Sequence, residues 1–297
     1  MSNALEWLQF VLAPQMINGL SIGVAVVLMA LGLTIIFGLL DVINMAHGEF
    51  YAIGAYLAVA LLGLGLSFWW ALVLTPLLMA VLGYATERGL IQRVFHSKDR
   101  HTLTLLLTFG VAVVLEDALK IVFGANPLRM EAPISGATEM VGLFFPNYRL
   151  FVMLFGGALI AAVWLLVFRT SVGAVVRAAA YDRHMSASLG VPVHRVYAAT
   201  FAFGVALAGI AGVLLAPIYS VFPTMGRDFV LIAFSVVIIG GMGSIKGAVL
   251  AGLLLTQVQS ISSLYISPVW SDPLLFGIMV LVLMWRPQGL FGKLGSA

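Results

Sequence analysis

Long apolar runs alternate with short polar stretches from about residue 16 to residue 285 of the chain. Within the runs the apolar residues are continuous rather than strictly alternating, which predicts membrane-spanning helices and not the strands of a barrel. One span takes about 20 residues, so the sequence has room for roughly 8 to 10 spans with short connections. We therefore expect an all-α, polytopic transmembrane helix bundle that forms a single domain over residues 1–297.

The apolar runs assign most of the spans directly. They cover residues 16–40, 68–84, 102–115, 150–168, 197–217, 229–239, 248–264 and 274–285. The run within residues 41–66 is shorter and is interrupted by glycines, so whether it crosses once, folds back or breaks stays open. Because transporters often build their pathway from broken helices, we expect a discontinuous second helix here.

The composition agrees with a membrane protein and excludes several other classes. Hydrophobic residues make up 62% of the chain and the mean hydropathy is +1.11, whereas soluble domains are roughly 45–50% apolar. The net charge is +3, but the cations are scattered between apolar runs, so we expect no nucleic-acid partner. The chain has no cysteine, which excludes disulfides and thiolate metal sites.

The positions of Lys and Arg predict the orientation in the membrane, because cytoplasmic loops are enriched in both. Eleven of the 15 fall on one side of the expected spans: Arg88, Arg93, Lys98, Arg100, Arg169, Arg177, Arg183, Arg195, Lys246, Arg286 and Lys293. The longest connection, residues 124–148, is then external. The first 15 residues hold no Lys or Arg, so we expect the first run to stay as a membrane anchor in the inner (cytoplasmic) membrane. The side of the N-terminus stays open.

A polar cluster lies between two apolar segments and is the first candidate for a functional site. It comprises Asp41, Asn44, His47 and Glu49, and the glycines Gly48 and Gly54 accompany it. Polar groups without water are costly in a bilayer, so the cluster either caps a broken helix or lines a substrate pathway. Asn44 and His47 are the better candidates for lining, and Asp41 for the surface. We expect neither a metal site nor catalytic residues, because no second histidine or carboxylate group stands at ligand spacing.

The second informative stretch is the basic loop over residues 169–196. Its candidate contact residues are Arg177, Ala178, Ala179, Asp182, Arg183 and Gly190. Small side chains in the middle of a helix let another protein approach closely, and the flanking charges would fix the register. An ordinary helix lying on anionic lipid is the alternative, and the loop taken alone favours it.

The sequence GGMGSIKG at residues 240–247 resembles a phosphate-binding loop only superficially. A Walker A motif has Gly before and Ser or Thr after its Lys, whereas Ile245 and Gly247 flank Lys246. We expect no nucleotide site in this chain. Its glycines are instead candidates for a helix break or hinge that mirrors the region of Gly48 and Gly54, and they are Gly240, Gly241, Gly243 and Gly247.

Three stretches together resemble a known family. They are NGLSIGVAVVLMALGLTIIFGLLDVINMAHGEFYAIGAYLA, RAAAYDRHMSASLGV and FSVVIIGGMGSIKGAVLAG. They are similar to the permease subunits of branched-chain amino acid ABC importers, of the LivH type, over nearly the whole chain. The resemblance implies a type II-like importer permease with no ATPase activity and no cofactor of its own. ATP is then bound by partner subunits.

The resemblance also implies partners and a mechanism. The partners are a second, LivM-like permease, two cytoplasmic ATPase subunits and a periplasmic or surface-tethered substrate-binding protein. Residues 177–190 become the coupling helix, although many importers begin this loop with Glu-Ala-Ala and here Arg177 takes the place of the Glu. Alternating access follows, in which the segments 41–66 and 229–255 rock about glycine hinges.

Other functions remain as alternatives at this stage. A permease of the same family could carry urea, short amides, or aromatic or dicarboxylic acids, because selectivity resides mainly in the binding protein. An ATP-independent channel or secondary transporter would need no coupling helix. An intramembrane enzyme is the weakest alternative, because the pair His47 and Glu49 lacks a visible nucleophile or metal set.

Overall fold

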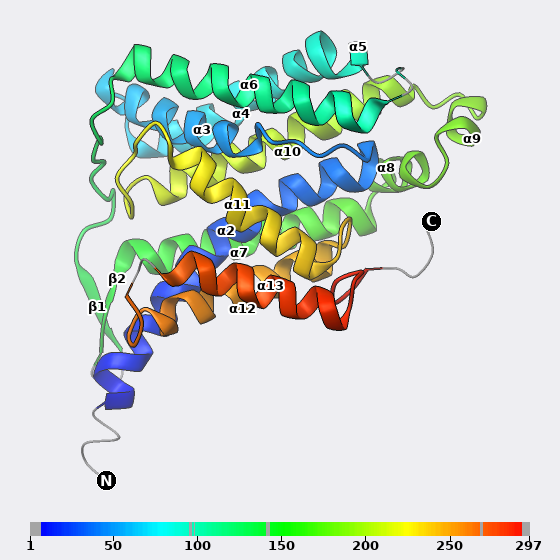
Figure 1. The fold of residues 1–297 in the computed structure, drawn as a ribbon. Coiled ribbons are helices and arrows are strands. Elements are labelled where there is room, and N and C mark those ends of the chain that lie inside the picture. Colours follow the sequence, from blue (N-terminus) through cyan, green and yellow to red (C-terminus); the bar gives the residue numbers. More distant parts are fainter. Residues whose placement is uncertain (1–6, 95–96, 98, 141–142, 268–269, 293–297) are drawn as a thin grey trace.

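Apolar helices run back and forth between two ends of the molecule in the computed structural model (Figure 1). The structure describes residues 7–94, 97, 99–140, 143–267 and 270–292. Five helical segments are long and apolar enough to cross a membrane: Phe10–Leu40, Phe68–Val94, Asn147–Arg169, Val193–Leu215 and Ile245–Ser262. The chain is therefore a multi-pass membrane protein, and the predicted helix bundle is confirmed.

The first half of the chain contains the elements up to the long connection. They are η1 (Leu8–Leu12), α2 (Ala13–Leu40), α3 (His47–Gly63), α4 (Phe68–Thr86), η2 (Glu87–Ile91), α5 (Gln92–Val94) and α6 (Arg100–Phe123). Both η elements are π-helical. Thirteen residues beyond α6 the chain forms a short hairpin of β1 (Ala137–Met140) and β2 (Leu143–Pro146). These two strands pair antiparallel, with Ala137 opposite Pro146, and were not expected from the sequence.

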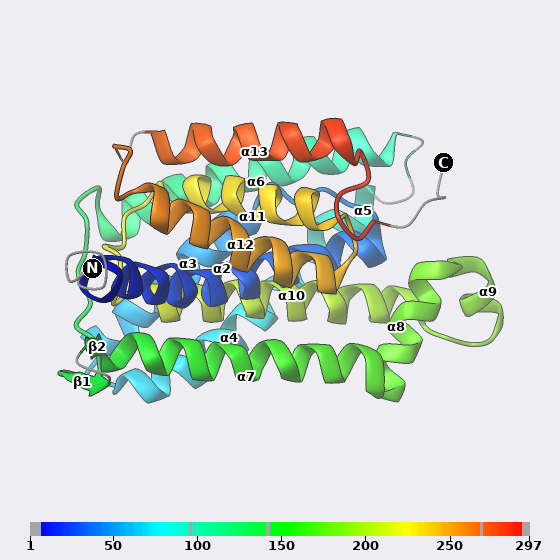
Figure 2. The ribbon, with the colours of Figure 1, turned by 90° about the horizontal axis from the view of Figure 1, so that it is seen from below.

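The second half continues directly from the hairpin. Its elements are α7 (Asn147–Arg169), α8 (Ser171–Tyr181), α9 (Arg183–Ser188), α10 (Val193–Leu215), α11 (Met225–Gly240), α12 (Ile245–Ser262) and α13 (Ser271–Trp285). Viewed from below, α2 and α10 lie between the layer of α6 and α13 and the layer of α4 and α7 (Figure 2). Both central helices are apolar on all sides and buried along most of their length, as expected of helices in the interior of a bundle.

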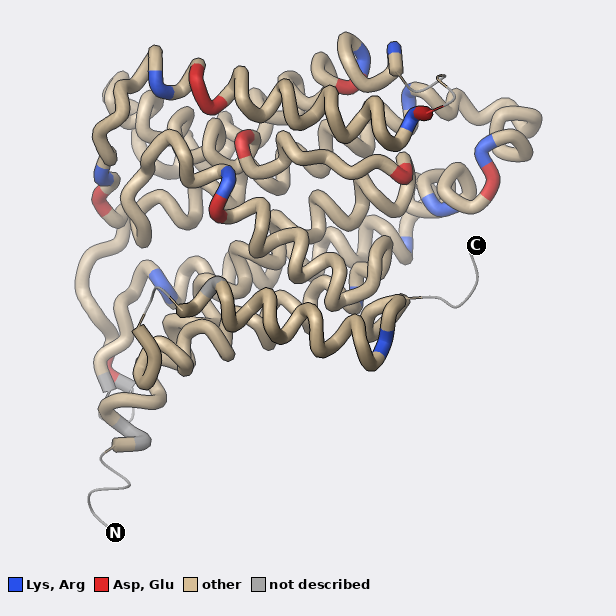
Figure 3. The backbone as a smooth tube through the Cα atoms, viewed as in Figure 1, with Lys and Arg blue, Asp and Glu red and all other residues tan. Residues whose placement is uncertain are grey.

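The two ends of the bundle differ in charge. One end carries α5, the α8–α9 pair and the turn after α11, and the other carries the β-hairpin and the start of α2 (Figure 1). Figure 3 shows positively charged positions gathered around the first end, which we call the basic end. The described helices thus alternate as the charge pattern predicts. Because α2 begins at the hairpin end, the N-terminal side that the sequence left open lies opposite the basic end.

Two helices begin inside the bundle rather than at one of its ends. After α2, residues 41–46 are non-helical and α3 begins at His47. After α10, residues 216–224 do not form a regular helix and α11 begins at Met225. The expected discontinuity after the first span is therefore present. It consists of an extended entry followed by a short helix.

The two broken segments belong to two halves of opposite direction. The series α2, α3, α4 and α6 runs in the reverse sense to α10, α11, α12 and α13 (Figure 1). At the centre Gly32 of α2 faces Gly204 of α10, and the contact is reciprocal. A Cβ on Gly204 would lie 2.8 Å from the Gly32 carbonyl oxygen, and one on Gly32 would overlap the Gly204 carbonyl. This is the pattern of an inverted repeat.

The segment 240–247 connects two helices. It is a tight turn between α11 and α12, in which Gly241 and Gly243 have φ angles of 99° and 79°, so the predicted glycine-rich helix break is present. Ser244 Oγ caps α12 by accepting from the Gly247 amide at 3.2 Å. Leu290 N–H donates to the Ile239 carbonyl at 2.8 Å, so the chain after α13 holds the turn in place. The segment 216–240 resembles residues 41–63 in having a non-helical entry followed by a short helix, so the counterpart lies before 240–247 in the chain.

Candidate functional site

The start of α3 lies near the middle of the bundle. His47 Nε2 is 3.0 Å from the carbonyl oxygen of Met29. Met29 is the 17th of the 28 residues of α2, counting from Ala13. At 1.5 Å per residue it lies about 24 Å from one end of that helix and about 17 Å from the other. The first turn of α3 is therefore at mid-depth.

The start of α11 meets the start of α3 at this depth. A side chain on Gly48 would overlap the carbonyl oxygen of Gly226, and one on Gly226 would come within 2.6 Å of the Glu49 carboxyl group. Each helix N-terminus leaves amide groups without intrahelical partners and carries a partial positive charge. Two half-helix N-termini therefore meet at mid-depth, which is where transporters bind polar substrates.

Asn44 and His47 are fully buried, with 0% of each exposed. Asn44 Oδ1 accepts from the Ala46 amide at 3.1 Å, and the Asn44 carbonyl accepts from the His47 amide at 3.3 Å. His47 Nε2 must carry the proton, because a carbonyl oxygen can only accept. These bonds stabilise the bend between residues 41–46 and α3. In this structure the two side chains hold the helix break and are not exposed to a path.

Gly54 and Asp41 lie away from the meeting point of the half-helices. A Cβ on Gly54 would come 2.7 Å from the carbonyl oxygen of Gly209, so Gly54 allows α3 and α10 to pack closely. Asp41 caps the end of α2 with a left-handed φ of 54° and pairs with Arg100 at 3.1 Å. Its side chain is more than half exposed, in agreement with the predicted surface position.

We expect replacement of His47 by alanine to lower the thermal stability of the purified protein. The change removes a buried imidazole together with its hydrogen bond to α2, and the bond alone contributes about 0.5–1.5 kcal/mol. Thermal unfolding followed by tryptophan fluorescence in detergent would measure this. A variant with unchanged stability and lost uptake would instead assign His47 to the path.

A group of charged residues surrounds the place where α3 and α11 meet. Glu116 on α6 accepts from Lys120 Nζ at 2.7 Å and from Arg227 Nη2 of α11 at 2.7 Å. The i,i+4 pair of Glu116 and Lys120 was expected from the sequence and is confirmed. Glu49 interacts electrostatically with this group and with Asp228, and its side chain is buried. We call Glu49, Glu116, Lys120, Arg227 and Asp228 the mid-depth charge cluster.

The mid-depth charge cluster is open on one side. The Arg227 side chain is 65% exposed, whereas that of Glu116 is 7% exposed. Charged groups at membrane depth face protein or a water-filled cavity rather than lipid. The face formed by α6 and the first turn of α11 therefore borders a wet path or another protein. Figure 3 shows how few charged positions lie between the two ends of the bundle.

Arg227 and Asp228 were not predicted as functional residues. Residues 218–228 lie between two apolar runs and read from the sequence as an ordinary turn. A signal was present, because HGE at residues 47–49 and MGR at residues 225–227 both open a half-helix with a polar residue after a glycine. Among the described residues, no group of three or more His, Asp or Glu could hold a metal ion.

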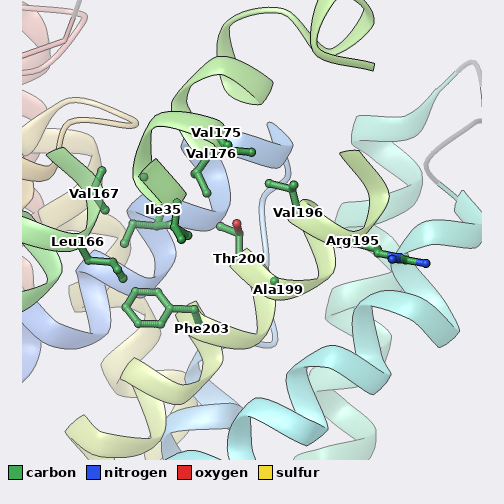
Figure 4. Close-up of a pocket in the computed structure, with 12 residues that line it drawn as sticks. Ile35, Leu166, Val167, Val175, Val176, Arg195, Val196, Ala199, Thr200 and Phe203 are labelled. Atoms are coloured by element: carbon green, nitrogen blue, oxygen red, sulfur yellow. The ribbon is translucent and has the colours of Figure 1, made fainter. Parts of the chain in front are cut away.

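The cavity shown in close-up in Figure 4 is apolar and lies elsewhere. It has a volume of about 470 Å³ between α2, α7, α8 and α10 (Figure 4). Branched apolar side chains such as Ile35 and Val176 line it, and Figure 4 shows Arg195 pointing away from it. A charged substrate would find no ionic partner among the side chains that point inward. We therefore do not place the path there.

The predicted coupling region forms two short helices that project beyond the basic end (Figure 1). Thr170 caps α8, and Asp182 Oδ1 caps α9 by accepting from the Met185 amide at 2.9 Å. Arg177 donates to the Val167 carbonyl and stacks on Phe168, at 5.6 Å from the ring centroid. Asp182 and Arg177 thus shape the helix pair itself.

The outer surface of this helix pair is apolar. Tyr181 is 95% exposed, and Met185 and Leu189 are exposed as well. Ala178 is exposed and Ala179 is buried. Gly190, with φ of 84°, ends α9 in a Schellman turn, in which the Val191 amide donates to the Ser186 carbonyl at 3.1 Å. Arg183 faces a cavity on the inner side of α9.

Comparison with known proteins gives a consistent result. The family model described as branched-chain amino acid transport system / permease component matches residues 15–283. The chain is 31% identical to the high-affinity branched-chain amino acid transport system permease protein LivH of Salmonella typhimurium, over 94% of this chain and 95% of that protein. It is 30% identical to BraD of Pseudomonas aeruginosa, with the same coverage of both chains.

A second type of permease is also similar to the chain. The high-affinity branched-chain amino acid transport system permease protein LivM of Escherichia coli is 28% identical over 89% of this chain and 67% of that protein. No solved structure matches the chain.

Proposed function

The chain belongs to the family of permease components of branched-chain amino acid transport systems, and on this premise we propose that it forms half of the translocation path of an ABC importer. Its cargo is a branched-chain or related amino acid. The chain lies in the inner membrane, and its partners are a second, LivM-like permease, two ATPase subunits and a substrate-binding protein. The relatives' names support a permease pair, since both LivH and LivM resemble this chain. The chain itself has no catalytic activity.

The observation that carries this proposal is the exposed mid-depth charge cluster. An amino acid is a zwitterion, so its passage through a membrane needs partners of both signs. Arg227 offers an exposed cation, and the buried Glu49 places a carboxyl group close to it. The N-termini of α3 and α11 add a partial positive charge for the substrate carboxylate. In this proposal the path runs along the open face of the cluster, between this chain and the second permease.

In this proposal the α8–α9 pair contacts the ATPase and transmits its conformational change to the permease. An exposed apolar surface on two capped helices at the basic end fits a groove in a cytoplasmic partner. Tyr181 and Leu189 are the proposed anchors. Asp182 acts mainly as a helix cap, so its negative charge matters less than its hydrogen bond.

Two substitutions of Asp182 distinguish its role as a helix cap from the role of its negative charge. Asparagine caps a helix as well as aspartate does, so we expect Asp182→Asn to keep ATPase coupling close to the wild-type level. Asp182→Ala removes the cap, which costs about 1 kcal/mol, and should lower coupled uptake. ATP hydrolysis per leucine transported is the measurement. Loss of coupling in Asp182→Asn would show that the charge itself contacts the ATPase.

Reconstitution tests the proposed function as a whole. The chain is purified with its neighbouring gene products and placed in liposomes with the binding protein. We expect the ATPase subunits to co-purify and leucine uptake to require ATP. Tyr181→Asp should reduce co-purification, while Tyr265→Asp, which changes an exposed tyrosine at the hairpin end, serves as the matched control. Uptake of leucine without ATPase subunits would contradict the proposal and favour a channel or secondary transporter.

A further inference from the structure

A small polar cavity lies at the basic end, apart from the mid-depth charge cluster. Its volume is about 240 Å³, and it opens between η2, α5, α9 and the start of α10. Glu87, Gln92, Arg183, His184, Ala187, Val193, His194 and Tyr197 line it. The cavity is smaller than the roughly 300–1,000 Å³ of pockets that hold drug-sized ligands. It therefore suits a small molecule.

Glu87 is the unusual residue of this cavity. Only 2% of it is exposed, and its Oε2 has no hydrogen-bond partner among the described residues. The adjacent cation, Arg88, donates instead to Gln92 Oε1 at 3.2 Å and to Tyr84 Oη at 3.4 Å. A buried carboxylate without a partner is costly. A ligand that brings a cationic donor would relieve this cost.

Basic side chains line the cavity opposite Glu87. Arg183 and His184 come from α9, and His194 from the first turn of α10. An arginine guanidinium suits a carboxylate, because its donors match the two oxygens. The methyl groups of Ala187 and Val193 add a small apolar wall. One kind of ligand matches all three parts of the lining, because it carries an ammonium group, a carboxylate and a short apolar side chain.

Glu87 also lies on a distorted element. It opens η2, a single π-helical turn that continues α4. Such turns are rare and occur frequently at functional sites. The opposite wall of the cavity belongs to α9, the helix that the proposed function places against the ATPase. Occupancy of the cavity would therefore join α9 to the end of α4.

We propose that this cavity binds a free α-amino acid on the cytoplasmic side, with its ammonium group on Glu87 and its carboxylate facing Arg183. Binding fixes α9 against η2 and slows coupled ATP hydrolysis when the imported product accumulates. The regulatory consequence rests on the proposed function. The binding itself does not.

Radiolabelled L-leucine is the probe, with the purified complex in nanodiscs and no binding protein present. We expect saturable binding that 4-methylpentanoate, which lacks the ammonium group, and 3-methylbutan-1-amine, which lacks the carboxylate, displace at least about tenfold more weakly. Glu87→Gln and Ala187→Trp should each weaken binding at least about tenfold, because the first removes the ionic partner and the second fills the cavity. Ala180→Trp is the matched control, since Ala180 is exposed on α8 and does not line the cavity.

Several outcomes would overturn the proposal. One is that the wild-type complex does not bind leucine. Another is that Ala187→Trp binds leucine as well as the wild type does, and a third is that 4-methylpentanoate competes as strongly as unlabelled leucine. Loss of binding in Arg227→Gln with retention in Glu87→Gln would place leucine at the mid-depth charge cluster instead. ATP-dependent uptake by the same preparation is measured in parallel. Failure of uptake counts against the proposed function, whereas failure of binding with intact uptake counts only against this cavity.

Discussion

Arg227→Gln should abolish most amino acid uptake while the complex still assembles and hydrolyses ATP. The guanidinium lies 2.7 Å from the buried carboxylate of Glu116 and is exposed on the face that we assign to the path. Its loss removes a cation for the substrate carboxylate. It also leaves the buried Glu116 with Lys120 as its remaining ion-pair partner among the described residues. A hydrogen bond to a charged group contributes about 1.5–3 kcal/mol, so we expect uptake to fall at least about tenfold.

The control for this experiment is Arg129→Gln. Arg129 is an exposed arginine in the connection between α6 and β1, outside the mid-depth charge cluster. We expect it to transport normally. The paired reversal Glu116→Arg with Arg227→Glu tests the ion pair, because it restores attraction while it inverts the charge that faces the path. We expect this double variant to assemble without transporting amino acids. Normal uptake by Arg227→Gln would remove the cluster from the path.

Gly48→Ala should strongly destabilise the protein, although alanine is the better helix former. In an exposed helix the exchange of glycine for alanine stabilises by about 0.5–1 kcal/mol. At Gly48 the new methyl group would overlap the backbone carbonyl of Gly226 and press on Val230. Overpacking of a buried contact costs about 1–3 kcal/mol, and the upper end applies where the neighbour is backbone and cannot rotate away.

The prediction can be tested by comparing the direction in which two glycine-to-alanine exchanges shift the thermal unfolding midpoint. Gly110→Ala on α6 is the matched control, because nothing lies within 4 Å of a Cβ at that position. We expect Gly110→Ala to raise the thermal unfolding midpoint slightly and Gly48→Ala to lower it by several degrees, measured by tryptophan fluorescence on the purified complex. Equal midpoints for both variants would show that α3 and α11 can separate at their crossing.

Local patterns in the sequence predicted much of the architecture. The apolar runs identify the helices, because a segment without charges enters a bilayer wherever it occurs in the chain. The basic residues predict which loops share one end, and the structure places α5 and the α8–α9 pair together there. Asp41 is at the surface as expected, and the glycine-interrupted stretch after it does begin a discontinuous helix.

The mid-depth site was only partly visible in the sequence. Glu49 was among the predicted residues, but Arg227 lies 178 positions later in what reads as an ordinary turn. Asn44 and His47 were expected to line a path, and the structure buries them in the bend before α3. Polar character alone does not reveal whether a side chain satisfies the backbone of a broken helix or faces a substrate.

The sequence by itself determined three properties of this protein. It is a helical membrane protein, it resembles a known family, and its basic loops lie at one end of the bundle. These properties depend on the partition of each segment between water and lipid, which is a local quantity. Only the tertiary structure decided that α3 and α11 begin at mid-depth and meet at Gly48 and Gly226. That contact joins two halves of opposite direction, and it follows from the close packing of backbones far apart in the chain, which no single segment encodes.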